Sequence, residues 1–246
     1  MASTVIHPFF TKLATRAIME GQPVLKTEDL GKTLEMAVCL AFRIPYVGTF
    51  KYDVAKAERL ALRLVELPTM FPVCTHTAAK GARYDFTSVS EPLCHLSAKT
   101  AKHKNAKVAP QVIGQCQPAK FCSIVGTDFV DVPKLKEFIQ TNITNILPVL
   151  VDYTFDCKNL YYNETTEKML FVEMHTRVDW SCYTYTWTRA CDSWTNSSTL
   201  KIHTSKGEYG LVEFQFHTKS RTNMAVRWCY DVFLDLFREN LTIREL

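Results

Sequence analysis

The stretch that organises the chain runs from Lys80 to Phe121, KGARYDFTSVSEPLCHLSAKTAKHKNAKVAPQVIGQCQPAKF. Its first half predicts a hairpin of two short strands, residues 81–86 and 93–99. Side chains alternate along a strand, so Ser97 and Lys99 share one face of the second strand. If the strands pair, the same face can carry Asp85. A carboxylate held beside a lysine is a recurrent way to bring a divalent cation and a phosphate together.

The second half of the stretch is basic and lacks acidic residues. No Asp or Glu occurs between Glu91 and Asp128, while five lysines fall there, and His103 lies among them: Lys99, Lys102, His103, Lys104, Lys107 and Lys120. The net charge of +4 does not by itself predict nucleic acid. Clustered lysines neutralise phosphates, which is the main source of sequence-independent DNA affinity. The alternative is a solvated lysine loop without a ligand. The nearness of these lysines to Asp85 and Lys99 favours DNA binding instead.

Several short segments carry a family resemblance. They are Asp85, Leu96-Ser-Ala-Lys99-Thr, Lys107-Val-Ala-Pro-Gln, Ile113-Gly-Gln and residues 212–228. The first four resemble the active-site region of type II restriction endonucleases of the PD-(D/E)XK nuclease superfamily. The last is similar to the strand–loop–helix that closes many of these enzymes. The chain departs from the family pattern at Tyr84, where Pro is expected, and at Ser97, where Asp or Glu is expected.

The resemblance implies an α/β fold with a restriction-endonuclease-like central mixed sheet flanked by helices, in one domain spanning residues 1–246. It also implies Mg²⁺ as cofactor, with Asp85, Lys99, Glu35 and Ser97 as the catalytic set. Asp85, Glu35 and the backbone or side chain at Ser97 would hold the metal. Lys99 would position the attacking water and stabilise charge on the phosphate. Glu35 lies in a predicted helix, and the alternative is that it faces solvent.

The predicted DNA contacts fall in two regions of the chain. They are Lys102, His103, Lys104, Lys107 and Gln115, and then Gln215, His217, Arg221 and Asn223. The second group follows or lies on the polar face of a strand at 211–217. Arg suits guanine, and Asn or Gln suits adenine, through paired hydrogen bonds in the major groove. The alternative for this region is structural, with Glu213 paired to Arg227.

The remaining pattern predicts helices and strands on either side of the hairpin. The expected helices are 3–20, 27–42, 53–67, 132–147 and 224–240, with Pro148 ending the fourth. The expected strands are 150–155, 169–174, 198–203 and 211–217. The aromatic segment 177–189 is either a packed strand or a DNA-facing one.

Composition sets broad limits on these expectations. The chain is 47% hydrophobic and 22% charged, as in ordinary globular proteins. No apolar run is long enough for a membrane span, so we expect no membrane partner. The amino-terminal sequence lacks the pattern of a signal peptide, and we expect a cytoplasmic protein. Nine scattered cysteines without a CxxC pair predict buried, reduced thiols rather than a zinc site at Cys182 and Cys191.

The predicted function is therefore a Mg²⁺-dependent type II restriction endonuclease that cuts double-stranded DNA at a short specific sequence. A homodimer and a companion DNA methyltransferase acting on the same site are the implied partners. The chain has no GxSxG, P-loop, GxGxxG or HExxH motif for other chemistries. Two alternatives stay open. One is a repair or recombination nuclease of the same fold, and the other is a non-catalytic DNA-binding protein that lost its acidic ligand at Ser97.

Overall fold

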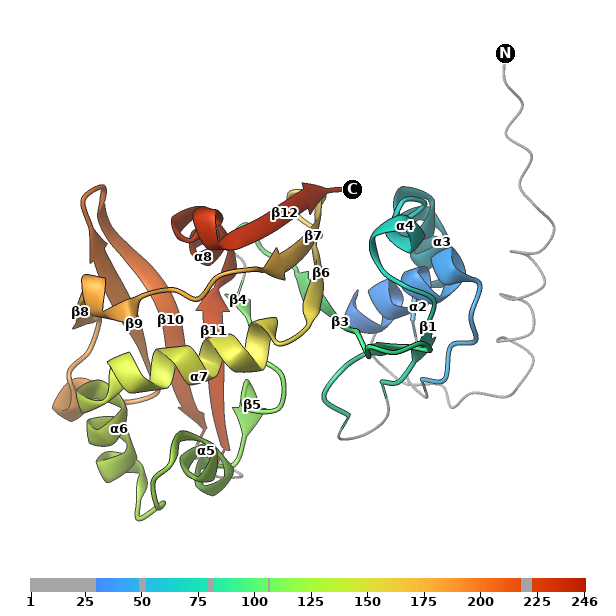
Figure 1. Ribbon diagram of the computed structural model, residues 1–246. Helices are drawn as coiled ribbons and strands as arrows, with labels where there is room; N and C mark the ends of the chain where they lie inside the picture. The colour runs from blue at the N-terminus through green and yellow to red at the C-terminus, as the bar shows by residue number, and fades with distance from the viewer. Residues whose placement is uncertain (1–29, 49–51, 79–81, 106, 218–222) are drawn as a thin grey trace.

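The computed structural model describes residues 30–48, 52–78, 82–105, 107–217 and 223–246. In this part of the chain the strands form two sheets (Figure 1). Sheet A has the order β1 (Cys74–His76), β2 (Phe86–Ser88), β3 (His95–Ala101), β6 (Lys158–Asn163), β7 (Lys168–Met174) and β12 (Leu241–Glu245). It is mixed, because β3 and β6 run parallel while its other pairs are antiparallel.

Sheet B is antiparallel and lies beside sheet A. Its order is β4 (Lys107–Val108), β11 (Asn223–Cys229), β10 (Gly207–His217), β9 (Ser197–Thr204) and β8 (Thr184–Trp187). The two-residue strand β5 (Gln115–Cys116) also pairs with β11. The predicted α/β class and the mixed sheet flanked by helices are confirmed. The second sheet was not anticipated from the sequence.

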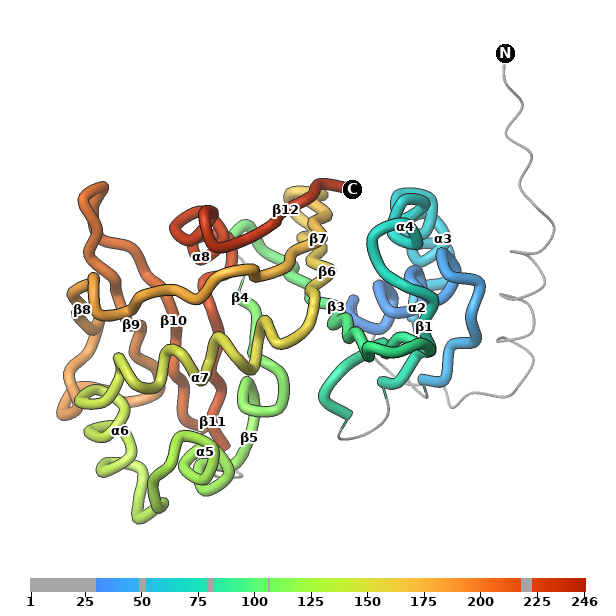
Figure 2. Tube along the Cα trace, viewed as in Figure 1, coloured from blue at the N-terminus to red at the C-terminus, as the bar shows by residue number. Residues whose placement is uncertain are grey.

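The described helices cover the two sheets from different sides (Figure 1). They are α2 (Leu30–Phe42), α3 (Val54–Arg63), α4 (Leu67–Met70), α5 (Pro118–Val125), α6 (Val132–Thr141), α7 (Ile143–Phe155) and α8 (Tyr230–Leu236). The first three gather at one end of the molecule, and α5 to α7 pack along sheet B. Figure 2 shows β3 between these two groups of helices. The predicted helix at 3–20 lies outside the described residues.

Strand β6 separates two hydrophobic cores. Tyr161 belongs to the core shared with α7, α8 and sheet B, whereas Leu160 and Tyr162 belong to the core under α2 and α3. This division follows from the alternation of side chains across a strand. Sheet A is therefore covered on both faces, and the residues at the ends of its strands are positioned by both cores.

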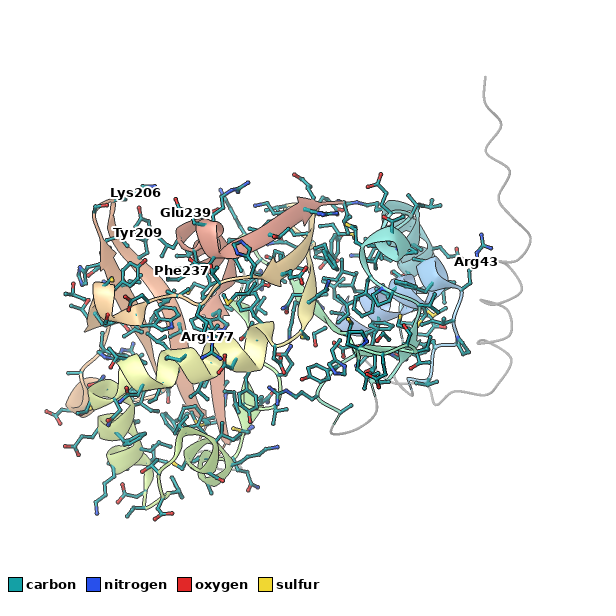
Figure 3. The ribbon with its side chains drawn as sticks, viewed as in Figure 1. Arg43, Arg177, Lys206, Tyr209, Phe237 and Glu239 are labelled. Atoms are coloured by element: carbon teal, nitrogen blue, oxygen red, sulfur yellow. The ribbon has the colours of Figure 1, made fainter. Side chains whose placement is uncertain are left out.

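Local caps account for the helix ends. The Asp53 side chain accepts a hydrogen bond from Lys56 N at the start of α3, and Asp131 does the same for Lys134 N at α6. Helix α2 ends at Phe42, and the next residue, Arg43, has a left-handed φ of 57° that directs the chain toward Pro45. The Arg43 side chain points away from the sheets (Figure 3).

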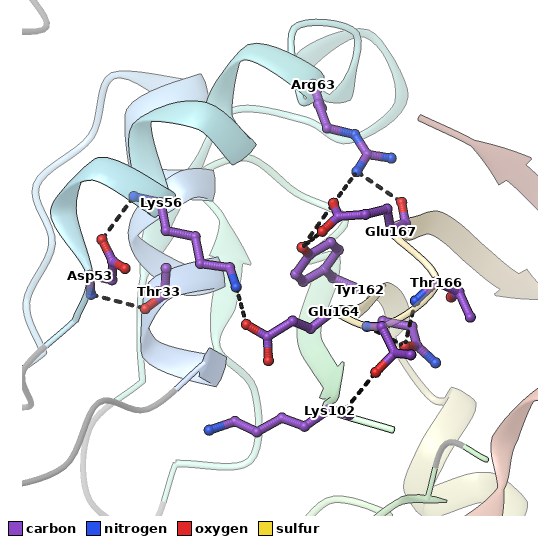
Figure 4. A network of polar contacts seen from close by, with 11 residues as sticks. Thr33, Asp53, Lys56, Arg63, Lys102, Tyr162, Glu164, Thr166 and Glu167 are labelled. Carbon is purple, nitrogen blue, oxygen red and sulfur yellow. Dashed lines mark hydrogen bonds and ion pairs between the residues drawn. The ribbon is translucent and has the colours of Figure 1, made fainter. Parts of the chain in front are cut away.

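A polar network ties α3 to the β6–β7 hairpin (Figure 4). Lys56 pairs with Glu164, and Arg63 Nη1 donates to the Glu167 carbonyl at 2.9 Å. The Thr165 hydroxyl donates to Lys102 O at 2.8 Å. The segment that follows β3 is therefore anchored through its backbone, while the Lys102 side chain remains exposed.

Two segments differ from the sequence prediction. Residues 132–155 form two helices, α6 and α7, that meet at Asn142, with Pro148 inside α7. The sequence pattern predicts instead one helix over 132–147 ended by Pro148 and a strand at 150–155. Residues 223–229 form strand β11 rather than the start of a closing helix, and α8 begins only at Tyr230. The segment 212–228 is thus part of the β10–β11 hairpin rather than a strand–loop–helix. The predicted strands at 169–174, 198–203 and 211–217 are present.

Candidate active site

Asp85 is fixed against β3 by two backbone contacts. Its N–H donates to Leu96 O at 3.2 Å, and its Oδ2 accepts a hydrogen bond from Ala98 N at 2.8 Å. Strands β2 and β3 pair with Phe86 opposite Leu96, so Asp85 falls opposite Ser97 at the end of the ladder. The predicted hairpin is confirmed, although its first strand begins at Phe86, five residues later than expected from the pattern. These contacts therefore hold the carboxylate through only one of its two oxygens, Oδ2.

Lys99 lies two residues after Ser97 on β3, and its Nζ donates to Ala109 O at 3.2 Å. Burial lowers the pKa of the Lys99 ammonium, while the nearby Asp85 carboxylate opposes that shift, as do Cys157 and Asp156. The net direction is downward, because the cost of desolvating the cation outweighs these attractions. Lys99 is thus a partly desolvated cation next to the Asp85 carboxylate.

Glu35 is buried in α2, with only 4% of its surface exposed. Its Oε1 pairs with Lys32 Nζ at 2.6 Å, and its Oε2 lies 3.1 Å from His76 Nε2. His76 Nδ1 accepts a hydrogen bond from Val47 N at 3.1 Å, so Nε2 carries the proton and donates to Glu35. The alternative of a solvent-facing Glu35 is therefore wrong.

The electrostatics bring Glu35 into the same site as Asp85 and Lys99. The pKa of Asp85 is raised, first by burial and then by the Glu35 carboxylate, while Lys99 and the Ala98 N–H act in the opposite direction. Helix α2 packs on β3, which places the Glu35 carboxylate near the end of the β2–β3 hairpin. Two carboxylates and a lysine therefore share a partly dehydrated region. Burial and mutual repulsion both disfavour the charged form of Asp85 there.

Ser97 occupies the position where the resemblance leads one to expect an acidic ligand. Its side chain is 1% exposed, and Oγ finds no hydrogen-bonding nitrogen or oxygen among the described residues. It lies instead beside the Cys157 thiol, whose pKa the hydroxyl lowers. The side chain is therefore buried beside Cys157, on the same face of β3 as Lys99.

The oxygen donors present fit a hard divalent cation. Mg²⁺ is commonly bound by one or two carboxylates, with several waters retained. Asp85 and Glu35 supply two such groups, and their mutual repulsion is what a cation would relieve. Both Glu35 oxygens are already engaged, so Asp85 is the more available ligand. Within the described ranges, no three His, Cys, Asp or Glu side chains gather in a metal-binding cluster.

Five of the predicted DNA contacts lie on one face of sheet B. The register places Gln215 opposite Ala225 and His217 opposite Asn223, and it places Gln115 and Lys107 opposite β11 residues of the same parity. The opposite face carries Phe214, Val226 and Trp228, which belong to the core. We call this surface the polar sheet face, and the predicted DNA contacts on it are Lys107, Gln115, Gln215, His217 and Asn223.

The other predicted contacts fall elsewhere. Lys102, His103 and Lys104 are exposed in the turn that follows β3, and Arg221 lies outside the described residues. The structural alternative for Arg227 is confirmed, since its Nη2 lies 2.9 Å from Glu213 Oε2. Lys107 Nζ occupies the other oxygen of Glu213 at 2.7 Å. The polar sheet face is therefore partly charge-compensated before any ligand binds.

Three residues around the site were not singled out by their sequence pattern. Gln111 binds Cys157 and the last turn of α7, Asp156 pairs with Arg83, and His76 holds Glu35. Gln111 stands in the quoted Lys107-Val-Ala-Pro-Gln segment, but nothing in that segment assigned it a role. A His or Gln inside an apolar string is the signal that was available.

A separate hollow of about 700 Å³ lies between the β9–β10 turn and α8. Its lining includes Lys206 and Tyr209, which Figure 3 shows at the tip of that hairpin. None of its lining residues comes from β2 or β3. We locate the active site by its chemistry, at Asp85 and Lys99, and not by the size of this hollow.

All nine cysteines are free, as expected, and five of them are buried. The expectation of burial is wrong for the other four, since Cys182 is exposed and Cys94, Cys191 and Cys229 are half-buried. Cys182 contacts Asp179, whereas Cys191 donates to Gln140 Oε1. The two cysteines thus have different partners, and the structure gives no support to a zinc site between them. In the described part of the chain, no helix is both long and apolar enough to cross a bilayer.

Comparison with known proteins identifies a relative. The chain is 38% identical over 228 residues to the type II restriction enzyme CviAII of Paramecium bursaria Chlorella virus 1. The chain is a homologue of a type II restriction enzyme. The match covers 89% of this chain and 63% of the length of the viral enzyme. No family model matches the chain, and no solved structure matches it.

Proposed function

We propose that this chain is a metal-dependent endonuclease that hydrolyses phosphodiester bonds in double-stranded DNA at a short specific sequence. The observation that carries the proposal is the placement of Asp85 and Lys99 on adjoining strands, with Glu35 in electrostatic reach. The similarity to a type II restriction enzyme supports the same chemistry. We assign the site to the PD-(D/E)XK type on the basis of this set.

Asp85 and Glu35 would hold Mg²⁺, which supplies a Lewis acid at the scissile phosphate and a more acidic bound water. Lys99 stabilises the negative charge that develops on the phosphate and orients the attacking water. Its partial burial strengthens this effect, because charges interact more strongly where water is excluded. The Ala98 N–H keeps the Asp85 carboxylate in place.

DNA would be contacted at two surfaces with different tasks. The exposed lysines after β3, Lys102 and Lys104, lie close in sequence to Lys99 and suit phosphate contacts. The polar sheet face carries Gln115, Gln215 and Asn223, whose side chains suit base edges. The proposal includes a homodimer, cytoplasmic action and a companion methyltransferase that protects the same sequence.

The decisive experiment is incubation of the purified chain with unmethylated duplex DNA and Mg²⁺, followed by sequencing of the ends. We expect discrete fragments with one sequence at every end, and no cleavage in excess chelator. The matched control is Lys99→Met, which keeps the length of the side chain and removes its charge. Cleavage that survives the chelator would contradict the metal mechanism.

The same experiment separates the alternatives. A structure-directed repair nuclease of the same fold would cut nicked or branched DNA without a fixed end sequence. A non-catalytic DNA-binding protein would retain the duplex without cutting it, and the serine at position 97 is the observation that keeps this alternative. Cleavage at one sequence excludes both.

A further inference from the structure

The ammonium group of Lys99 is held by a backbone carbonyl, and that carbonyl belongs to a short connection. Ala109 lies between β4 and β5, each of which contributes only two residues to sheet B. Such short strands fix the ends of the connection but not the direction of its carbonyl groups. The position of Lys99 therefore depends on what holds residues 109–114.

Gln111 holds this connection at both its backbone and its side chain. Its N–H donates to Tyr153 O at 2.7 Å, and its Nε2 donates to Cys157 Sγ at 2.9 Å and to Thr154 O at 3.4 Å. These acceptors lie at the end of α7 and just after it. With 6% of its surface exposed, Gln111 fastens the connection to a rigid helix two residues from Ala109.

The Cys157 thiol links Gln111 to the catalytic strand. The Ser97 hydroxyl lies beside this thiol, and Lys99 is near enough to lower the pKa of Cys157 against the rise that burial causes. Gln111 Oε1 is buried without a hydrogen-bond partner among the described residues. An unpaired buried oxygen costs stability, so packing alone does not explain a glutamine at this place.

We propose that Gln111 is a positioning residue for Lys99. Its side chain fixes the connection at 109–111, whose Ala109 carbonyl orients the Lys99 ammonium toward Asp85. The catalytic consequence rests on the proposed endonuclease function, but the positioning itself does not. The two are therefore tested by separate measurements.

Positioning is tested by the reactivity of Lys99 toward an amine-directed methylating reagent, read by peptide mass spectrometry with exposed Lys102 as the internal reference. We expect Gln111→Met to raise the relative labelling of Lys99 about fivefold, the change that corresponds to one lost hydrogen bond. The matched control is Gln140→Met, since Gln140 also contacts a carbonyl, Arg189 O, and a thiol, Cys191 Sγ. It should leave Lys99 labelling unchanged.

Cys157 provides a second pair of variants if Gln111→Met does not fold. Cys157→Ala removes one acceptor of Gln111 and should raise Lys99 labelling, whereas Cys157→Ser keeps an acceptor and should restore most of the protection. Unchanged labelling in either folded Gln111→Met or Cys157→Ala would overturn the proposal. This result is readable even if the chain cleaves no DNA.

The catalytic consequence is measured by cleavage kinetics of Gln111→Met. We expect kcat to fall about 10- to 100-fold, because a displacement of about 1 Å at a catalytic group is that costly. Duplex affinity measured in Ca²⁺ should stay at the wild-type value, since Gln111 is buried and touches no predicted DNA contact. Raised labelling with an unchanged kcat would overturn the link from Lys99 position to catalysis.

Discussion

Ser97 is the residue at which a single side chain tests the metal assignment. Its hydroxyl is buried beside Cys157 and has no nitrogen or oxygen partner among the described residues. A serine hydroxyl stays protonated and cannot offset the charge of a divalent cation. These two facts separate Ser97 from Asp85, although both lie on the same hairpin.

We expect Ser97→Ala to retain most of the cleavage rate. The free energy of unfolding should change by no more than about 1 kcal/mol, because the hydroxyl that is lost was poorly paired. Single-turnover cleavage and chemical denaturation measure the two effects. Asp85→Ala is the matched control and should abolish cleavage with the fold intact. If Ser97→Ala is as inactive as Asp85→Ala, the hydroxyl is a ligand and the metal set is wrong.

Glu35 combines a structural and a chemical role, and two substitutions separate them. Glu35→Gln keeps the shape and removes the charge, so we expect a large loss of cleavage with a small loss of stability. Glu35→Ala also leaves Lys32 and His76 without their carboxylate, which should cost about 2–3 kcal/mol of unfolding free energy. Thermal and chemical denaturation should be measured beside the cleavage rate.

A Glu35→Gln variant that cuts normally would place the second carboxylate elsewhere. Glu91 is then the next residue to substitute, since it lies in the turn between β2 and β3. In the structure its Oε2 accepts a hydrogen bond from Leu93 N at 3.0 Å, which is a turn contact away from the Asp85 carboxylate.

At the scale of elements, sequence patterns predicted the catalytic hairpin but misassigned two core elements. Residues 150–155 contain β-branched and aromatic side chains, which favour a strand locally. Buried positions at Leu147, Leu150, Val151 and Thr154 follow helical spacing, however, and this tertiary burial decides in favour of α7. A proline at the sixth position of α7 is tolerated because burial of one face of the helix stabilises it.

Strand β11 shows the opposite error. Met224, Val226 and Trp228 alternate cleanly into the core, with Asn223 and Arg227 on the polar sheet face. The helix predicted at 224–240 joined this strand to residues 230–236, which do form α8. The alternation of the strand is visible in the sequence. The strand and the helix that follows it, however, form one continuous apolar run, so the point where the two-residue period changes to the helical period was not recognised. Long-range contacts such as Gln111 to Cys157 have no comparable local signal.

The lysines of the stretch that follows Lys99 should differ in their effect on DNA binding. Lys102→Ala should weaken binding equally for cognate and random duplexes and lower the salt slope by about one. Lys107→Ala should have a smaller effect, because Glu213 already neutralises its charge at 2.7 Å. Binding in Ca²⁺ across a salt series measures both slopes. Equal slopes for the two variants would mean that Glu213 releases Lys107 when DNA binds.

At the scale of the whole molecule, the candidate site lies where the two cores meet. Helix α2 brings Glu35 from one core, while Gln111 ties the connection that holds Lys99 to the end of α7, which belongs to the other core. Trp228 Nε1 donates to Thr154 Oγ1 at 2.9 Å, which joins sheet B to the last turn of α7. A change in either core therefore reaches the catalytic residues through β3, and occupation of the site should in turn stabilise the whole fold.

Divalent cation should raise the melting temperature of the protein in the absence of DNA. Ligands that bind only the folded state add stability by mass action, about 2.7 kcal/mol at a concentration 100 times Kd. For a chain of this size each kcal/mol corresponds to roughly 2–4 °C. The physical reason is that the cation relieves the repulsion between Asp85 and Glu35 that raises the pKa of Asp85.

Differential scanning fluorimetry with Mg²⁺, Ca²⁺ and excess chelator measures this effect, and Asp85→Asn is the matched control. We expect the variant to lose the cation-dependent rise, because its amide cannot offset the charge of the ion. Without cation the variant should melt no lower than the wild type, since the substitution removes one of two repelling carboxylates. An equal rise in both proteins would place the bound cation away from Asp85. The electrostatic attraction between Asp85 and Lys99 would then serve the fold rather than a metal.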